Sequence, residues 1–394
     1  MGEFAKKTVR DAYVQGKKVL LRVDFNVKIK DGRISEDARV RAALPTINYL
    51  LERQASLIII SHLGRPHGQY EEKYSLRPVV VLLQQLLERP VLFAADCLGA
   101  AAKRQAAALE EGQVLMLENL RFHAGEEHND PIFAGKLAKL ADIYVDDAFG
   151  VAHRAHASTE GVAEYLPAYA GLLLENELKS LSKVLSGQER PLLAVIGGAK
   201  VADKIGIIEN LLDKVDKLLL GGGMANTFLA ACGCDMQGSP VEEERLPYIK
   251  ELLNSPAGAK LVLPVDVVAA AAFEAGADRQ TVEPLAMPAG WLALDIGPQT
   301  RRIFAQELAQ AGAIIWNGPV GVFEMEPFAA GTLAVAQAVA QSGAFSVVGG
   351  GDSIAALNQA GLADRIGFIS TGGGAMLEFL EGKKLPGVAV LEDR

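Results

Sequence analysis

Charged and imidazole side chains follow the apolar, strand-like runs in the first half of the chain. The residues that lie at or just after these runs are Asp24, Asn26, Arg39, His62, Arg65, Arg121, His153 and Arg154. In open α/β sheets, ligands bind at the carboxyl ends of the strands. An arginine guanidinium binds a carboxylate or phosphate through two parallel hydrogen bonds. One arginine alone would more often be a surface residue in a loose ion pair, but their shared position predicts a pocket for a small polyanion.

The apolar runs of the second half end in glycine instead. The glycine-rich ends are Gly197-Gly198, Gly221-Gly222-Gly223, Gly349-Gly350-Gly351 and Gly372-Gly373-Gly374. Glycine lets backbone N–H groups approach phosphate oxygens, and a helix that follows adds its positive end. One such turn is a weak signal, because tight turns often need glycine for backbone reasons. Four of them in one half-chain predict a backbone cradle for phosphates.

The familiar nucleotide-binding signatures do not explain these glycines. A G-x-G-x-x-G motif that begins at 221, 349 or 372 would need a glycine where Asn226, Ile354 and Leu377 stand. There is no G-x-x-x-x-G-K-[ST] loop either. A dehydrogenase is therefore disfavoured, and the phosphate loop is of another kind.

Two lysines and a carboxylate accompany the glycine-rich ends. If a helix starts near residue 199, Lys200 and Lys204 face one side of it, beside a phosphate site. An ammonium there could offset charge on a transferring phosphoryl group, although both could also be solvated. Asp352 is the best metal candidate, since a carboxylate beside phosphates usually shares Mg²⁺. Asp352 or Ser353 could instead cap the following helix.

Composition limits the class of protein. A chain of 394 residues suggests two domains. The net charge of −9 argues against a nucleic-acid-binding surface. The apolar runs are too short for a membrane span, and the charged N-terminus lacks a signal segment. Cys97, Cys232 and Cys234 build no disulfide framework and have no second Cys or His pair for a metal, which indicates a reduced, cytoplasmic protein. The histidines expected to be solvated are His67, His123 and His128.

Short apolar runs alternate with helix-like segments along the whole chain. The clearest helical segments are 75–88, 101–110, 131–141, 205–213, 300–311 and 329–340. This alternation predicts an α/β fold of two doubly wound, Rossmann-like parallel-sheet domains. A strong helix pattern at 172–181, broken at 186–191, predicts a hinge helix between them. We expect an N-terminal domain at 1–170, the connecting helix at 171–187 and a C-terminal domain at 188–381.

Eight motifs resemble the phosphoglycerate kinase family. They are RVDFN at 22–26, HLGRP at 62–66, ENLRF at 118–122, DAFGVAHR at 147–154, GGAKV at 197–201, WNGPVGVFE at 316–324, GGGDS at 349–353 and STGGGA at 370–375. The motifs run in the order of the family over nearly the whole chain. Several are long and are not shared with other kinases, so the resemblance is specific.

The resemblance implies reversible phosphoryl transfer between 1,3-bisphosphoglycerate with Mg-ADP and 3-phosphoglycerate with Mg-ATP. It implies Mg²⁺ as cofactor, a monomer, no nucleic-acid or membrane partner, and a C-terminal segment at 382–394 that returns to the N-terminal domain. Two ligands on two domains imply closure about the hinge helix. The alternative from another class is a non-catalytic, two-domain protein that binds a small anion, since such proteins also close about a hinge.

The resemblance also implies roles for single residues. The phosphoglycerate-binding residues would be Asp24, Phe25, Asn26, Arg39, His62, Leu63, Gly64, Arg65, Arg121 and Arg154. The nucleotide-binding residues would be Lys200, Lys204, Gly221, Gly222, Leu294, Asn317, Val322, Glu324, Gly350, Gly351, Asp352 and Ser353, with Asp352 as the Mg²⁺ carboxylate. The catalytic residues would be Arg39, Lys200, Gly351 and Gly374.

Overall fold

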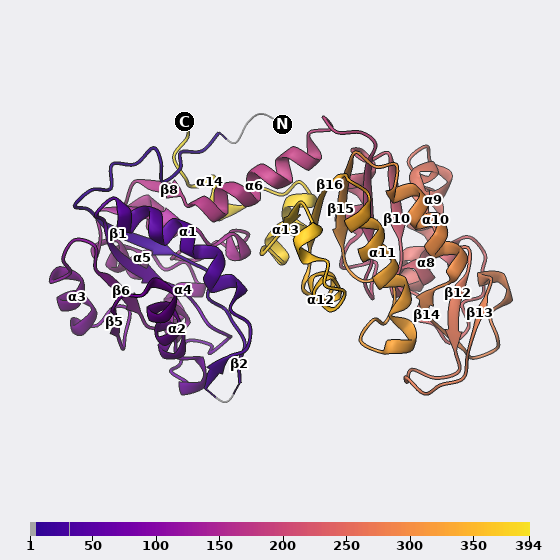
Figure 1. Cartoon of the computed structure of the whole chain (residues 1–394), viewed down its shortest axis with the longest axis horizontal. Coiled ribbons are helices and arrows are strands. Elements are labelled where there is room, and N and C mark those ends of the chain that lie inside the picture. Colours follow the sequence, from indigo (N-terminus) through magenta and orange to yellow (C-terminus); the bar gives the residue numbers. More distant parts are fainter. Residues whose placement is uncertain (1–4, 31) are drawn as a thin grey trace. The chain divides into compact units, whose positions relative to one another are not determined.

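The computed structural model describes residues 5–30 and 32–394, and the chain divides into two compact units (Figure 1). The first, called here the N-terminal unit, runs to Lys179 and also contains Lys384–Arg394. The second, the C-terminal unit, is Ser180–Lys383. Each unit has its own sheets and its own core, so each is described separately.

The N-terminal unit is built on a six-stranded parallel sheet in the order β5-β6-β4-β1-β7-β8. Its strands are β1 (Lys18–Arg22), β4 (Ser56–Ile60), β5 (Val91–Ala94), β6 (Val114–Leu117), β7 (Ile143–Asp146) and β8 (Ala168–Ala170). The strand order reverses between β1 and β7. In open α/β sheets, such a reversal point is where ligands bind.

Both faces of this sheet are covered, because successive residues of β4, β6 and β7 are all buried. The absence of apolar–polar alternation in these runs is what a doubly covered strand requires. The helices of the unit are α1 (Ala38–Glu52), α2 (Arg77–Leu87), α3 (Ala100–Ala107), α4 (Ala124–Glu127), α5 (Pro131–Ala138) and α14 (Pro386–Ala389). Helix α5 begins where the sequence requires it, since the Asp130 carboxylate accepts the backbone N–H of Phe133 at 2.8 Å. A small hairpin pairs β2 (Ile29–Lys30) with β3 (Arg33–Ile34).

Residues Lys6 and Lys7 lie beside the C-terminal segment in the N-terminal unit. The backbone N–H of Lys7 donates to the carbonyl of Glu392 at 2.7 Å, and that of Glu392 donates to Ala168 at 3.0 Å. The Lys6 ammonium lies 2.7 Å from the Asp393 carboxylate. Thr8 in turn forms a parallel bridge with Ala170, so these residues lie at the edge of the sheet beside β8 and the C-terminal segment pairs with them.

The C-terminal unit contains a second six-stranded parallel sheet, in the order β11-β10-β9-β15-β16-β17. Its strands are β9 (Leu192–Ile196), β10 (Lys217–Leu220), β11 (Leu261–Val262), β15 (Ala313–Asn317), β16 (Phe345–Gly349) and β17 (Phe368–Ile369). Here the order reverses between β9 and β15. A separate antiparallel sheet joins β12 (Val267–Ala270) to β13 (Arg279–Val282) and β14 (Leu292–Ile296).

The helices of the C-terminal unit are α7 (Ile205–Leu212), α8 (Gly223–Ala231), α9 (Leu246–Asn254), α10 (Pro298–Leu308), α11 (Ala330–Gln341), α12 (Gly351–Gln359) and α13 (Gly374–Leu380). Trp316 of β15 is fully buried at the centre of the core, where its indole N–H donates to the carbonyl of Gly318 at 2.9 Å. Helix α6 (Leu172–Leu185) carries the chain from one unit into the other. Its first turn is capped by the Asp147 carboxylate, which accepts the N–H of Leu173 at 2.9 Å.

The predicted class of fold, α/β with two parallel sheets, is confirmed. The helix predicted at 205–213 is confirmed as α7, which begins at Ile205. The condition of a helix start near residue 199 is not met, since residues 197–204 form an irregular loop and turn. The antiparallel sheet of β12, β13 and β14 was not predicted, since the exposed β13 carries no apolar run. In the described part of the chain, no helix combines the length and the apolar character that a membrane span would need.

Candidate active site

The carboxyl ends of the strands in the N-terminal unit hold a buried arginine–histidine pair. Arg22, the last residue of β1, is 1% exposed and donates through Nε to the Ser158 hydroxyl at 2.8 Å. Its Nη2 lies 3.2 Å from Nδ1 of His62, which follows β4. A guanidinium can only donate, so Nδ1 of His62 is the acceptor. In the neutral ring the proton is therefore on Nε2, which makes that atom a donor.

Positive charge converges on His62. Burial, followed by the charges of Arg22, Arg121, Arg154 and Arg39, holds the pKa of His62 well below its ordinary value. The ring is therefore neutral at physiological pH. The field of four arginines at one buried point is the electrostatic signature expected of an anion-binding pocket.

Arg39, in the first turn of α1, is held by the loop that follows β1. Its Nη1 donates to the Asp24 carboxylate at 2.9 Å and to the carbonyl of Asn26 at 3.2 Å. The Asn26 side chain in turn accepts the N–H of Gly64 at 2.9 Å. Asp24 thus orients the arginine, and Asn26 links the loops that follow β1 and β4.

Arg121 is buried with unused donors. It lies in the short 3₁₀ helix η2 (Leu120–Phe122), where its backbone N–H donates to the Asn119 side chain at 3.0 Å. Its Nη1 donates to the carbonyl of Gly64 at 2.8 Å, and Nε lies 3.3 Å from a Glu127 carboxylate oxygen. Its Nη2 is buried without a hydrogen-bond partner. Burial is the largest cause that lowers the pKa of Arg121 to about 10, so the group remains charged at neutral pH while Nη2 keeps an unused donor.

Four residues that support this pocket were not predicted, namely Arg22, Glu126, His156 and Ser158. The Glu126 carboxylate is fully buried and accepts the hydroxyl of Ser158 at 2.6 Å and its N–H at 3.0 Å. His156 lies 3.9 Å from Glu126, and burial followed by the neighbouring arginines lowers the pKa of His156 to about 3. Only the position of Arg22 gave a signal in the sequence, as an arginine within an apolar run.

The other predicted residues of this half differ in what they can offer a ligand. Arg154 is half-buried near His153, with 3.3 Å between Nε and the ring Nε2. Arg65 is exposed directly after Gly64. The side chains of Phe25 and Leu63 are buried in the core of the unit. Any contact that these two predicted residues make with a ligand would therefore come from their backbone, and their assignment stays a prediction.

The glycine-rich ends in the C-terminal unit are of two kinds. Gly197 and Gly222 are packed against backbone, so that a Cβ on Gly197 would lie 2.0 Å from the Pro319 carbonyl and one on Gly222 2.8 Å from the Gly198 carbonyl. Glycine is required there to let loops approach each other. The sequence predicts phosphate contacts at these glycines, but the close packing of the backbone is enough to explain why glycine stands at both positions.

The glycines before α12 and α13 are open. A Cβ on Gly351 or Gly373 would meet nothing within 4 Å. Gly350 has a φ of +92°, a conformation that favours glycine, and it directs the following N–H groups along the start of α12. Exposed backbone N–H groups at a helix start are suited to phosphate oxygens. Asp352, in the first turn of α12, is exposed beside them.

The two predicted lysines are placed differently. Lys204 points inward, and its ammonium donates to the carbonyl of Gly197 at 2.6 Å and to the Asn317 side chain at 2.7 Å. Burial lowers the pKa of Lys204 to about 8. Lys200 is exposed in the loop that follows β9. The expectation that both lie on one face of a helix is wrong, because both precede α7.

Like Arg121 in the N-terminal unit, Asn317 in the C-terminal unit has a buried hydrogen-bond donor without a partner. It is 3% exposed at the end of β15, with its side-chain oxygen occupied by Lys204 and its Nδ2 buried without a partner. A Cβ on Gly350 would lie 3.2 Å from this Nδ2, so the donor is directed toward the open glycine turn. The Ser353 hydroxyl, by contrast, already accepts the N–H of Gly318 at 2.7 Å, so it orders the loop.

Four further residues that were predicted to bind the nucleotide or to be catalytic lie elsewhere in the C-terminal unit. Gly374 is the exposed first residue of α13, and Glu324 is exposed in the loop after β15. Val322 is half-buried, and its N–H donates to the carbonyl of Leu294 at 2.8 Å. Gly221 packs against the Val320 side chain, only 2.5 Å from a Cβ placed there.

A small cavity lies beside Gly222 and Leu294, two of the predicted nucleotide-binding residues. Its volume is about 10 Å³, and its lining includes Gly222, Leu294 and the unpredicted Asn226 and Asp295. That volume is about one water molecule, so it does not admit a purine base as it stands. The Nδ2 of Asn226 is buried there without a partner. Burial raises the pKa of Asp295 to about 7.

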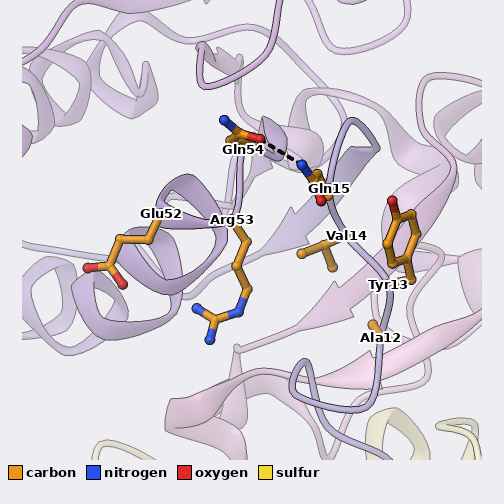
Figure 2. Close-up of a pocket in the computed structure, with 7 residues that line it drawn as sticks. All are labelled: Ala12, Tyr13, Val14, Gln15, Glu52, Arg53 and Gln54. Atoms are coloured by element: carbon orange, nitrogen blue, oxygen red, sulfur yellow. Dashed lines mark hydrogen bonds between the residues drawn. The ribbon is translucent and has the colours of Figure 1, made fainter.

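A larger hollow lies at the amino ends of the strands in the N-terminal sheet, opposite the carboxyl ends where the predicted site residues lie. It has a volume of about 410 Å³ and is lined by residues 12–15 and 52–54, shown in Figure 2. These residues precede β1 and β4, so they flank the amino ends of the strands. Figure 2 shows the side chains of Gln15 and Gln54 joined by a hydrogen bond of 2.8 Å. None of the predicted site residues lines this hollow, and ligands of α/β sheets bind at the opposite end.

Two parallel α/β sheets, one with arginine-lined and one with glycine-lined strand ends, define an enzyme of the phosphotransferase class. A sequence model described as "Phosphoglycerate kinase" matches residues 9–383. The chain belongs to the phosphoglycerate kinase family. This membership does not favour the alternative of a non-catalytic binding protein.

Individual relatives match over their full length. The chain is 57% identical to a phosphoglycerate kinase of Moorella thermoacetica over 392 residues, which is 99% of this chain and 100% of that protein. It is 57% identical to one of Chloroflexus aggregans, with 98% and 99% covered. The solved phosphoglycerate kinase of Coxiella burnetii is 45% identical with a TM-score of 0.89, and 98% of each chain is covered.

Proposed function

We propose that this chain transfers a phosphoryl group reversibly between 1,3-bisphosphoglycerate with Mg-ADP and 3-phosphoglycerate with Mg-ATP. The observation that carries the proposal is the buried Arg121, whose Nη2 has no hydrogen-bond partner, beside a His62 that burial and four arginines keep neutral. A buried donor left without a hydrogen-bond partner is costly, even where another atom of the same guanidinium meets a carboxylate. An anionic ligand of small size supplies the missing partner.

In this proposal the acceptor in the ATP-consuming direction is the carboxylate of 3-phosphoglycerate. Such a group has an ordinary pKa of about 3.5–4, so it is ionised at neutral pH and needs no general base. The neutral His62 fits this requirement, because it offers Nε2 as a hydrogen-bond donor to the ligand rather than taking a proton. Asp24 and Asn26 orient Arg39 toward the same ligand.

The nucleotide is assigned to the glycine turns of the C-terminal unit. The backbone N–H groups at the start of α12, where Gly351 has open space beside it, and the unused Nδ2 of Asn317 would hold phosphate oxygens. Mg²⁺ fits beside them, since Asp352 is an exposed carboxylate with open space next to it. Bound there, the ion would neutralise phosphate charge while keeping most of its waters. Lys204 secures Asn317 and the end of β9.

Catalysis then consists of positioning and of charge stabilisation on the transferring group. Arg39 and Lys200 are assigned to the equatorial oxygens of the transferring group. Arg39 approaches these oxygens from the phosphoglycerate side, and Lys200 approaches them from the nucleotide side. Residues 1–170 would bind phosphoglycerate, 188–381 the nucleotide, and the helix at 171–187 would be the hinge, with 382–394 returning to the first part. Transfer requires the two ligands to meet, and closure about the hinge also excludes water from the acyl phosphate.

The first test is a coupled assay with 3-phosphoglycerate and Mg-ATP, run with and without EDTA. We expect ADP production that requires both substrates and is abolished by EDTA, then restored by excess Mg²⁺. ADP release without 3-phosphoglycerate would indicate a simple ATPase. No metal-dependent ADP production at all would overturn the proposal.

Replacing Arg121 by glutamine tests the anion pocket. We expect KM for 3-phosphoglycerate to rise about 10- to 100-fold, because a charged hydrogen bond of about 1.5–3 kcal/mol is lost. KM for ATP should change less than about twofold, since Arg121 belongs to the N-terminal unit. The matched control is Arg104→Gln, on helix α3 away from the strand ends. Equal rises in both KM values would point to misfolding rather than to a lost anion contact.

A further inference from the structure

Outside the anion pocket, the N-terminal unit holds three side chains with different metal-ligating atoms. Asp96 and Cys97 lie in the loop between β5 and α3, and His123 follows η2. One ligand atom from each residue lies within 4.8 Å of the other two. The sequence predicted a solvated His123, but its Nε2 is 2.8 Å from the Asp96 carboxylate. We propose that Asp96, Cys97 and His123 bind a divalent transition-metal ion of the zinc type.

The donor set selects the class of ion. Thiolate sulfur, imidazole nitrogen and carboxylate oxygen together suit Zn²⁺ and Co²⁺, whereas Mg²⁺ and Ca²⁺ prefer oxygen ligands alone. Ligand atoms around a tetrahedral zinc lie about 3–4 Å apart, given bonds of about 2.0–2.3 Å. The three atoms therefore need to approach by only about 1 Å.

The loop holds Asp96 in place. Its carboxylate accepts the N–H of Leu98 at 3.3 Å, and a Cβ on Gly99 would lie 2.5 Å from its second oxygen. The glycine therefore lets the loop wrap closely around this carboxylate. Cys97 is 1% exposed, while the side chains of Asp96 and His123 are 40% and 36% exposed. An ion can enter from solvent on their side, and a water molecule can complete its coordination.

The surrounding charge favours a cation at the cysteine. The carboxylates of Asp96, Glu126 and Glu118 all exert their negative charge on Cys97. On binding, the ion forms a bond with Sγ and the thiol proton leaves to solvent, as is usual for cysteine ligands.

The test is titration of the full-length, metal-free protein with Co²⁺, with Zn²⁺ as competitor. We expect one Co²⁺ per chain, with the near-ultraviolet absorption of a cobalt–thiolate bond, displaced stoichiometrically by Zn²⁺. Cys97→Ser should abolish that absorption, and both Cys97→Ser and His123→Gln should weaken binding at least about 10²-fold, as loss of a ligand exceeds loss of a supporting contact. The matched controls are Cys232→Ser and His128→Gln, both at exposed positions, which should leave binding unchanged.

Each other outcome contradicts the proposal. Absence of the thiolate absorption in the unaltered protein would exclude Cys97 as a ligand. Its persistence in Cys97→Ser, or its loss in Cys232→Ser, would place the ion at the Cys232-Gly233-Cys234 segment instead. If Cys97→Ser fails to fold, His123→Gln decides, because that side chain is partly exposed. Unweakened binding by a folded His123→Gln variant would overturn the site.

Discussion

Alanine at Arg39 or at Lys200 is expected to lower kcat at least about 10²-fold, the usual effect of removing one preorganised charge contact to a transition state. The reason differs between the two residues. Arg39 is already oriented, since Asp24 and the Asn26 carbonyl hold its Nη1 at 2.9 and 3.2 Å. Alanine removes the charge and also leaves the partly buried Asp24 without this partner. Steady-state kinetics with both substrates saturating will measure kcat directly.

Lys200 lies exposed in its loop, so its contribution comes only from charge brought to the transferring group. The fall in kcat for Lys200→Ala should therefore occur with little change in thermal stability. Two matched controls separate this role from general surface charge. Arg41→Ala removes an exposed arginine of the same helix as Arg39, and Lys250→Ala removes an exposed lysine of α9. Both controls should retain kcat within about twofold, and near-normal turnover in Arg39→Ala and Lys200→Ala would refute the assigned roles.

The position of the anion pocket could be predicted from the sequence because parallel strands end at one edge. Asp24, His62 and Arg121 follow three apolar runs, and the structure brings them together at the edge beside the β1–β7 reversal. The residues that support them could not be predicted. The bond between Arg22 and Ser158 spans 136 residues of sequence, and no local pattern marks either residue as its partner.

The two lysines show where spacing is insufficient. Residues four apart share a face only within a helix, and neither Lys200 nor Lys204 lies inside one. Lys204 is turned inward by Asn317, which is 113 residues away. The glycine-rich ends raise a similar difficulty, because a tightly packed glycine such as Gly197 and an open one such as Gly351 look alike in sequence. Only the neighbours of each backbone distinguish them.

Asp146 couples the stability of the N-terminal unit to pH. It is fully buried at the end of β7, where Oδ1 accepts the N–H of Ala148 at 2.9 Å and Oδ2 has no hydrogen-bond partner. A Cβ on Gly387, in the C-terminal segment, would lie 3.2 Å from Oδ2, so there is little room for water. Burial is the largest cause that raises the pKa of Asp146 from 3.8 to about 7.

The sign of the pH dependence follows from that raised value. Between about pH 4 and pH 7, the folded chain keeps a proton on Asp146 that the unfolded chain has lost, so the free energy of unfolding falls as pH rises. From pH 5 to pH 8 the loss that this group causes is about 3 kcal/mol. Asp147, whose pKa burial raises to about 6, adds a smaller loss of the same sign. It is present in both the unaltered chain and the variant compared below, so it does not affect their difference.

We therefore expect Asp146→Asn to lose about 3 kcal/mol less unfolding free energy than the unaltered chain between pH 5 and pH 8. At pH 5 the variant should be the less stable, because its amide places an unpaired N–H group where Oδ2 has no partner, at a cost of about 1–3 kcal/mol. Urea unfolding at both pH values, followed by a signal from the N-terminal unit, measures this difference. Asp142→Asn, at an exposed position just before β7, should keep the slope of the unaltered chain. Parallel slopes for Asp146→Asn and the unaltered chain would mean that Asp146 is already ionised at pH 5, and that the buried charge is stabilised by Arg22.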